Sequence, residues 1–338
     1  MGGLTKIIKH NKVPKVILRY IMMNFLDLNS IKVLLLTVKI MNILDHYSKK
    51  FLENAINGFA WNCENGHLDV AQWLAFNFYE CDIDYEQVFR IVCSKGHLAM
   101  AKWLLKISMS YQVEIDIHAH DELAFRWACE FGHLNVAQWL VQFNVNVWAD
   151  NGYAFILSCM NNHFNVAKWL HFFDQNGIDI NIRTNAFART CWRGHLHILK
   201  WLHSLGDINI HIDDEYAFRG ACYMGHLDVA QWLHSLLMQN KINIHADNGD
   251  IFANACLQGR LVLAKWLYSL GTNIHIRDEY AFILACQYGH LDVAKWLYSL
   301  SDINEEEKIN IHAQNNYAFK YSKPPVKMWL DSISKIKI

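Results

Sequence analysis

The chain is poor in the residues that break regular structure. Among its 338 residues there are only three prolines and 16 glycines, whereas 53% are hydrophobic and 13% are aromatic. Such a composition excludes collagen-like and intrinsically disordered chains. The sequence therefore predicts a folded protein with ample apolar material for a core.

The chain also lacks an excess of either charge. Lysine and arginine number 31 and aspartate and glutamate 32, a net charge of −1. No overall field would attract nucleic acid or an anionic membrane, and we expect neither as a partner. Residues 1–50 nevertheless hold nine basic and two acidic residues, a net charge of +7 that leaves −8 for the remainder. This asymmetry predicts that the first fifty residues form a separate unit.

No apolar run is long enough to cross a membrane. The longest, Ile31–Leu44, is interrupted by Lys32 and Lys39 and is shorter than the roughly 20 residues of a transmembrane helix. The first residues show no secretory signal, and Lys6 stands where a myristoylation signal needs serine or threonine. We therefore expect an intracellular, cytoplasmic protein.

Motifs that signal catalysis are missing as well. The sequence contains no phosphate-binding glycine loop, no His-Glu-x-x-His zinc motif and no evident Ser-His-Asp arrangement. We expect a protein that is not an enzyme and needs no cofactor.

What the chain has in abundance is repetition. The stretch Gly225–Leu236, GHLDVAQWLHSL, returns almost unchanged at Gly289–Leu300 as GHLDVAKWLYSL. A phenylalanine column keeps the same register, and its ninth member, Phe319, opens a degenerate last unit. Eight units are visible from the tryptophans at positions 73, 103, 139, 169, 201, 232, 266 and 296.

Each unit predicts two helices. The segment before Gly225, EYAFRGACYM, predicts a first helix that ends at this glycine in a left-handed conformation. After the Gly-His pair the apolar residues recur at i, i+3, i+4 and i+7, as in His195–Leu205, and predict an amphipathic second helix. Because one pair cannot bury its apolar stripe alone, stacked units must share a core.

Two columns invite comparison with helix caps and metal sites. Aspartate or asparagine stands four residues before most of the phenylalanines, and we expect N-caps at residues 121, 151, 214, 248, 278 and 315.

Eight of the nine cysteines share a column, and helices about 8–10 Å apart cannot bring them within disulfide reach. We expect buried thiols and, since each unit supplies one Gly-His histidine, no zinc site.

The order of helix, Gly-His turn, helix and extended loop, at a period near 33 residues, resembles the ankyrin repeat. The resemblance covers roughly Asn54–Leu300 and a partial unit beyond, although Tyr216–Arg219 replaces the family's Thr-Pro-Leu-His. The residues that hold the family's expected places in one unit are Ala221, Gly225, His226, Val229 and Leu233.

This resemblance implies an all-α ankyrin-repeat solenoid of about eight to nine helix-turn-helix units with short extended loops, plus an N-terminal helical segment. We expect a basic segment at 1–50, the repeat array at 51–322 and a C-terminal capping helix at 323–338. The family further implies that the Gly-His imidazoles hydrogen-bond backbone groups of neighbouring loops. The particular sequence of the repeats is similar to that of ankyrin proteins from giant DNA viruses of amoebae. This resemblance would place the chain in host cytoplasm.

Ankyrin arrays are protein-binding scaffolds, so the resemblance implies a monomer that binds a partner protein along its concave face and loops, a host protein if the viral resemblance holds. Aromatic and arginine residues are the usual anchors of interfaces. Among the first-helix positions that vary between units, those we favour for partner binding are Trp127, Trp192, Arg193, Tyr223 and Tyr288.

Val13–Lys39 is similar in spacing to an F-box, through which a protein docks on the adaptor of a cullin-type ubiquitin ligase. Val16 stands where that pattern has an acidic residue, and a worn repeat or helical cap is the alternative interpretation. The residues that would dock the adaptor are Pro14, Ile17, Leu18, Ile21 and Leu26.

Overall fold

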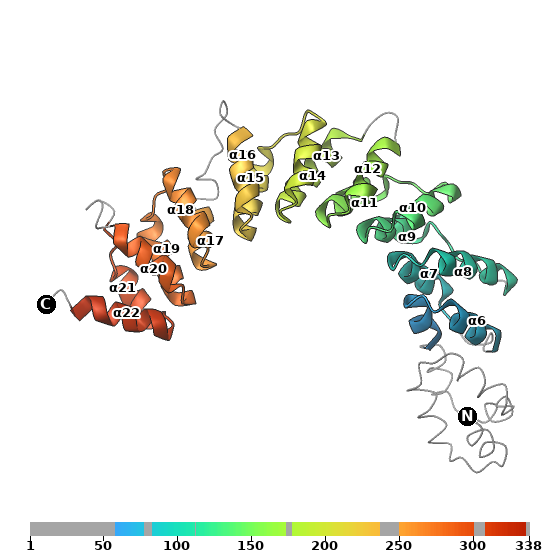
Figure 1. The fold of residues 1–338 in the computed structure, drawn as a ribbon, viewed down its shortest axis with the longest axis horizontal. Helices are drawn as coiled ribbons and strands as arrows, with labels where there is room; N and C mark the ends of the chain where they lie inside the picture. The colour runs from blue at the N-terminus through green and yellow to red at the C-terminus, as the bar shows by residue number, and fades with distance from the viewer. Residues whose placement is uncertain are drawn as a thin grey trace, which may run out of the picture. The chain divides into compact units, whose positions relative to one another are not determined.

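The computed structural model describes residues 58–77, 83–111, 113–173, 178–236, 250–300 and 308–335 of the chain. Within these ranges the regular structure is helical, and no β-strand occurs (Figure 1). Contacts divide the chain into two units. The first comprises Met1–Ala128 and Asn135–Val145, and the second comprises Cys129–Leu134 and Asn146–Ile338.

The first unit contains α6 (Leu68–Asn77), α7 (Tyr85–Ser94), α8 (Leu98–Ser110) and the short 3-10 helix η1 (Val141–Phe143). Two helices carry residues of both units, α9 (Ala119–Glu130) and α10 (Leu134–Leu140). The second unit continues with α11 (Ala149–Met160), α12 (Phe164–Phe173), α13 (Ile180–Cys191), α14 (Leu196–Ser204), α15 (Ile212–Met224), α16 (Leu227–Leu236), α17 (Asp250–Leu257), α18 (Leu261–Ser269), α19 (Ile276–Tyr288), α20 (Leu291–Ser299), α21 (Ala313–Tyr321) and α22 (Pro324–Lys335).

Helices of the second unit alternate between two roles. The first helix of each repeat packs against the first helix of the next, in the order α11, α13, α15, α17, α19 and α21. Each also packs against the second helix of its own repeat, as in the pairs α13–α14 and α15–α16 (Figure 1). The prediction of two stacked helices per period is confirmed.

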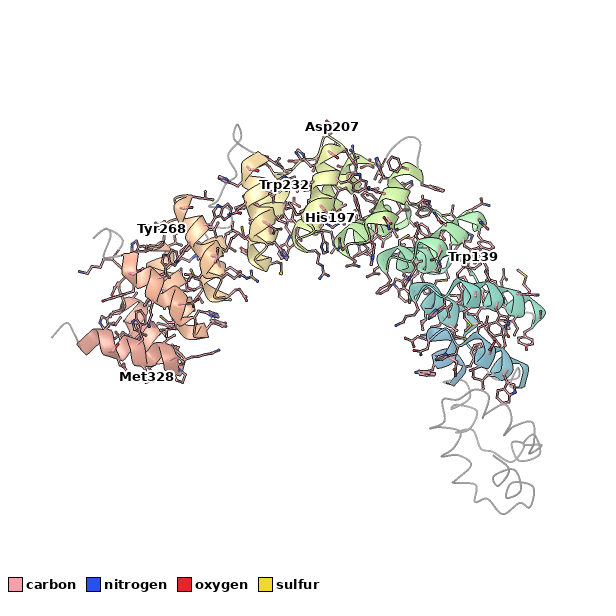
Figure 2. The ribbon with its side chains drawn as sticks, viewed as in Figure 1. Trp139, His197, Asp207, Trp232, Tyr268 and Met328 are labelled. Carbon is pink, nitrogen blue, oxygen red and sulfur yellow. The ribbon has the colours of Figure 1, made fainter. Side chains whose placement is uncertain are left out.

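Aromatic side chains form the seams between repeats. The ring of Phe218 lies 6.3 Å from that of Trp266 in the next repeat. Tyr268, labelled in Figure 2, contacts Trp296 of its next repeat edge-on. The column phenylalanines from Phe59 to Phe282 are buried, whereas the tryptophans of the repeat column are half-buried except for buried Trp139. The same pairing recurs at Phe59–Trp103, Phe89–Trp139, Phe155–Trp201, Phe187–Trp232, Phe252–Trp296 and Phe282–Trp329.

The second helices turn one side inward, as their periodicity predicts. In α14, Ile198 and Leu202 are buried, whereas His197 and Lys200 are exposed (Figure 2). Burial of apolar area stabilises the fold by roughly 25 cal/mol per Å². The buried side of these helices therefore contributes to stability, whereas the exposed side faces solvent.

The cysteine column is buried, as predicted. All eight described thiols are fully inaccessible and none forms a disulfide. Burial disfavours the charged thiolate, and it raises the pKa of Cys63 and of Cys286 to about 12. It raises the pKa of the other six thiols as well. These thiols act as small apolar side chains, and Cys81 lies outside the described residues.

Polar contacts at the Gly-His turns complete the seams. Gly194 has a φ of +78°, and a methyl group there would lie 2.3 Å from Nδ1 of His226 in the next repeat. Nε2–H of this histidine donates to the carbonyl of Trp192 at 3.2 Å, and His97 bonds the carbonyl of Glu64 in the same way at 3.1 Å. The expected bonds from the imidazoles to neighbouring backbone are thus present.

Two seams use a cation where the others use histidine. Arg260 donates to the carbonyl of Cys222 at 3.2 Å and lies over Gly225. Lys323 lies over Gly289 at the entry to the last helix, α22. Histidine, arginine and lysine therefore all occur at this position.

The loops enter five of the first helices through three consecutive left-handed residues. In α15 these are Asp213, Asp214 and Glu215, with φ of 50°, 53° and 60°. The same geometry occurs at residues 120–122, 150–152, 277–279 and 314–316. Each non-glycine residue in this conformation costs roughly 1–2 kcal/mol, so hydrogen bonds nearby must compensate.

This geometry overturns the N-cap prediction. A cap residue has an extended backbone, whereas Asp121, Asn151, Asp214, Asp278 and Asn315 are left-handed. Residue 248 lies outside the described ranges.

Caps occur instead in two loops without the left-handed turn. Asp84 accepts the Gln87 N–H at 2.8 Å, and Asp179 accepts the Asn181 N–H at 2.6 Å.

Candidate interaction surface

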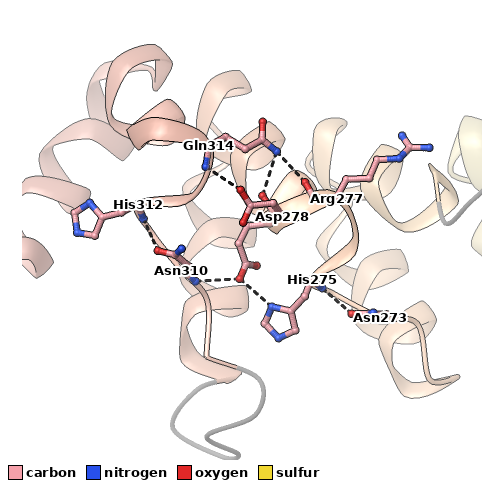
Figure 3. A network of polar contacts seen from close by, with 8 residues as sticks. Asn273, His275, Arg277, Asp278, Asn310, His312 and Gln314 are labelled. Atoms are coloured by element: carbon pink, nitrogen blue, oxygen red, sulfur yellow. Dashed lines mark hydrogen bonds and ion pairs between the residues drawn. The ribbon is translucent and has the colours of Figure 1, made fainter.

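Acidic residues of the loops hold neighbouring repeats together. Oε1 of Glu279 lies 2.9 Å from Nδ1 of His275 and accepts the N–H of Asn310 in the next repeat at 3.0 Å (Figure 3). The carboxylate of Asp278 accepts the backbone N–H of Gln314 at 3.0 Å. These carboxylates therefore link the loops of neighbouring repeats. The same His–Glu pair recurs at His118–Glu122 and His211–Glu215.

Two arginines of the first helices bind their own left-handed turns. Arg126 donates from Nε to the carbonyl of Asp121 at 2.8 Å and from Nη2 to that of His120 at 2.9 Å. Arg219 donates from Nη2 to the carbonyl of Asp213 at 3.2 Å. Both side chains support the strained turn, which explains arginine directly after the column phenylalanine.

An aromatic cluster lies where α13 meets α15. The Trp192 ring, just after α13, has its centroid 5.2 Å from that of Tyr216 and 6.1 Å from that of Tyr223, both on α15. A methyl group at Gly220 would lie 2.1 Å from Nε1 of Trp192. The indole therefore rests on the bare backbone of α15 and is held between two tyrosines, half-buried.

The structure brings together three of the five residues predicted for partner binding. Arg193 is exposed and follows Trp192, which contacts Tyr223. Tyr288 ends α19 farther along the second unit and is 45% exposed. Trp127, on α9, belongs to the first unit and is half-buried.

Two members of the cluster were not predicted. Tyr216 stands two residues before Phe218, at a position that is also tyrosine at 153, 280 and 317. This recurrence of tyrosine at one repeat position could have indicated Tyr216. No sequence pattern indicates Gly220, because its lack of a side chain matters only through the indole that packs against it from a neighbouring repeat.

Charge is divided between the two ends of the first helices. In the second unit, the segments 155–163, 186–195, 217–226, 251–260 and 282–290 carry four arginines and no acidic residue. The entries of these helices carry the acids, among them Asp150, Asp213, Asp214 and Asp250. Acids at N-termini and cations at C-termini suit the helix dipole, although Arg219 turns toward the entry of its helix and Arg277 lies at the entry of α19.

Two further kinds of feature, metal-ligand clusters and membrane-spanning helices, are absent from the described residues. Across the described ranges no three or more histidine, cysteine, aspartate or glutamate side chains gather as metal ligands would. Within the same ranges, no helix has both the length and the apolar character needed to cross a bilayer. The predicted adaptor-docking residues Pro14, Ile17, Leu18, Ile21 and Leu26 lie outside the described residues.

These features define a class, the helical solenoid whose repeats share one core and present loops and first helices to solvent. The family model for ankyrin repeats in three copies matches residues 59–151 and 91–184. The fold of the described residues is thus an all-α ankyrin-repeat solenoid, and the repeats that the model matches are of a type that mediates protein–protein binding. A search among curated proteins found no match to the chain.

Acid is expected to destabilise the repeats around His163 and His195. Burial lowers the pKa of both imidazoles below the usual 6.5, and nearby positive groups, Arg193 among them for His195, lower it further. Below about pH 6.5 the unfolded chain therefore binds protons that the folded chain does not. The free energy of unfolding should therefore be highest above that pH, where both imidazoles are neutral in either state, and should fall as the pH drops.

Urea unfolding at about pH 7.5 and about pH 5.5 measures this loss. The matched variant His163→Gln with His195→Gln should show a smaller difference between the two pH values. An undiminished difference in this variant would place the acid sensitivity elsewhere.

Proposed function

We propose that this chain is a non-enzymatic scaffold that binds a partner protein through the exposed side of its first helices and the adjoining turns. The observation that carries the proposal is the cluster of Trp192, Tyr216 and Tyr223 beside Arg193 on an ankyrin stack. Aromatic and arginine side chains dominate the binding energy of protein interfaces. The partner is a host-cell protein if the likeness to giant-virus repeats extends to origin.

The cluster also suits binding because it is held in place before a partner arrives. Contacts with both tyrosines and with the backbone at Gly220 restrict the indole. A side chain that is already ordered loses less conformational entropy on association. A partner contacting it therefore gains more than from a mobile surface residue.

Crosslinking in the native cell, followed by mass spectrometry, tests the proposal. Partner crosslinks should map to the end of α13 with its turn, residues 186–195, and to α15, residues 212–226. Trp192→Leu should abolish capture, since loss of an interface anchor costs about 2 kcal/mol or more. Lys200→Ala, on the exposed side of α14, is the control that should retain the partner. Crosslinks confined to the second helices, with capture insensitive to Trp192→Leu, would contradict the proposal.

The same experiment separates this function from that of a ubiquitin-ligase adaptor. Pro14→Ala with Leu18→Ala should leave capture through the repeats unchanged. Loss of every partner in this variant, with Trp192→Leu harmless, would favour docking through residues 13–45 instead.

A further inference from the structure

We infer that the cluster around Trp192 takes an acidic segment of the partner, with an apolar side chain of that segment on the aromatic rings. The inference rests on the proposed function and specifies the chemistry of what binds. It concerns only the second unit. The surface consists of Arg189, Trp192, Arg193, Tyr216 and Tyr223, here called the Trp192 surface.

The first step is the continuity of the edge on which this surface lies. His226 lies over Gly194 and Arg260 lies over Gly225, so the C-terminal ends of α13, α15 and α17 are neighbours. Residues 186–195, 217–226 and 251–260 contain four arginines and no aspartate or glutamate. At these ends a partner meets the charges of Arg189, Arg193 and Arg260. Arg219 instead turns to the carbonyl of Asp213 at the entry of its helix, and Asp228 follows in the first turn of α16.

The second step is the position of two arginines within that edge. Arg193 is exposed, and its charge lowers the pKa of neighbouring His195, after burial and together with His197 and His226. Arg189, one turn before Arg193, bonds Asn185 of its own helix through Nε at 2.8 Å. Nη1 and Nη2 of Arg189 make no side-chain hydrogen bond within α13. A planar guanidinium can donate two parallel hydrogen bonds to a carboxylate.

The third step argues against a long polyanion such as a nucleic acid. Arg260 and Arg219 spend donors on carbonyl groups of the fold yet keep their charge. At the other end of the same helices the exposed Asp213 and Asp214 add negative charge. A phosphate backbone running over both ends would meet repulsion, whereas a short acidic segment can remain along the positive edge.

Fluorescence anisotropy with a labelled peptide tests the inference on the full chain. The probe is a dodecapeptide alternating glutamate and leucine, and the comparison probes are its lysine–leucine counterpart and a twelve-residue oligothymidine. We expect the acidic peptide to bind most tightly. Its affinity should fall as salt is raised, because exposed charges are screened.

Charge reversal supplies the matched variants. Arg189→Glu with Arg193→Glu should weaken acidic-peptide binding about tenfold or more, since like charges across an interface are repulsive. Lys200→Glu with Lys265→Glu changes the net charge equally on the exposed sides of α14 and α18 and should leave binding within about twofold. Trp192→Leu should also weaken binding while urea unfolding shows that each variant is folded.

Four results would overturn the inference. They are no binding of the acidic peptide, equal binding of the lysine peptide, tighter binding of oligothymidine, or equal effects of the two charge-reversal pairs. A cellular partner whose crosslinked segment is not acidic, but whose capture still needs Trp192, would refute the acidic chemistry and leave the proposed scaffold standing. A partner insensitive to Trp192→Leu would refute both.

Discussion

Replacing Phe218 with alanine is expected to remove about 3–5 kcal/mol from the free energy of unfolding. The side chain is 1% exposed, and its ring packs against Trp266 of the next repeat. The substitution therefore leaves a cavity at a seam on which two repeats depend. In a solenoid, stability is a sum of repeat and interface terms, so damage at one seam weakens both neighbours.

Urea unfolding followed by circular dichroism measures the effect. The matched control is Met224→Ala, on the same helix α15 but 46% exposed, which should change stability by no more than about 0.5 kcal/mol. Broadening into two transitions in the Phe218 variant would show that the seam couples the two sides. Equal losses in both variants would refute the assignment of Phe218 to the core.

The second large effect is expected at a turn. Gly194→Ala should cost about 2–4 kcal/mol, because an L-residue is strained at positive φ and because overpacking is costly. The φ of Gly194 is +78°, and the added methyl group would lie 2.3 Å from His226 Nδ1. The imidazole would have to leave its bond to the Trp192 carbonyl.

Gly206 separates the two causes. Its φ is +82°, yet a methyl group there would have nothing within 4 Å, so Gly206→Ala should cost only the backbone strain of about 1–2 kcal/mol. In a His226→Ala background, the cost of Gly194→Ala should fall to a similar value. If Gly194→Ala and Gly206→Ala prove equally costly, contact with His226 contributes nothing.

Much of the fold follows from the sequence because the repeats restate the same pattern. The spacing of Ile198 and Leu202 predicts the inward side of α14, and the structure buries both. Gly225 and Gly289 were predicted to end first helices in a left-handed conformation, and both do so, with φ of 81° and 88°. Periodicity and glycine chemistry act locally, and such signals can be read from one chain.

The loop geometry could not be predicted in the same way. Aspartate and asparagine favour both helix caps and left-handed turns, so the column containing Asp278 fitted either. The choice depends on contacts between repeats, such as the bond from Gln314 to Asp278. The site divides similarly, since residue type pointed to Trp192 whereas its support by Gly220 depends on packing between helices.

Arg260 and Lys323 occupy the turn position that is histidine in the other repeats, and this difference affects where the solenoid first unfolds in acid. These two cations are already charged at neutral pH, so mild acid adds no buried charge at the turns they cover. The turns around His163 and His195 must accept one, because burial lowers the pKa of both imidazoles. Acid should therefore loosen the chain from an interior point near α12–α14, and a protease present at that moment would cut there before it trimmed α22.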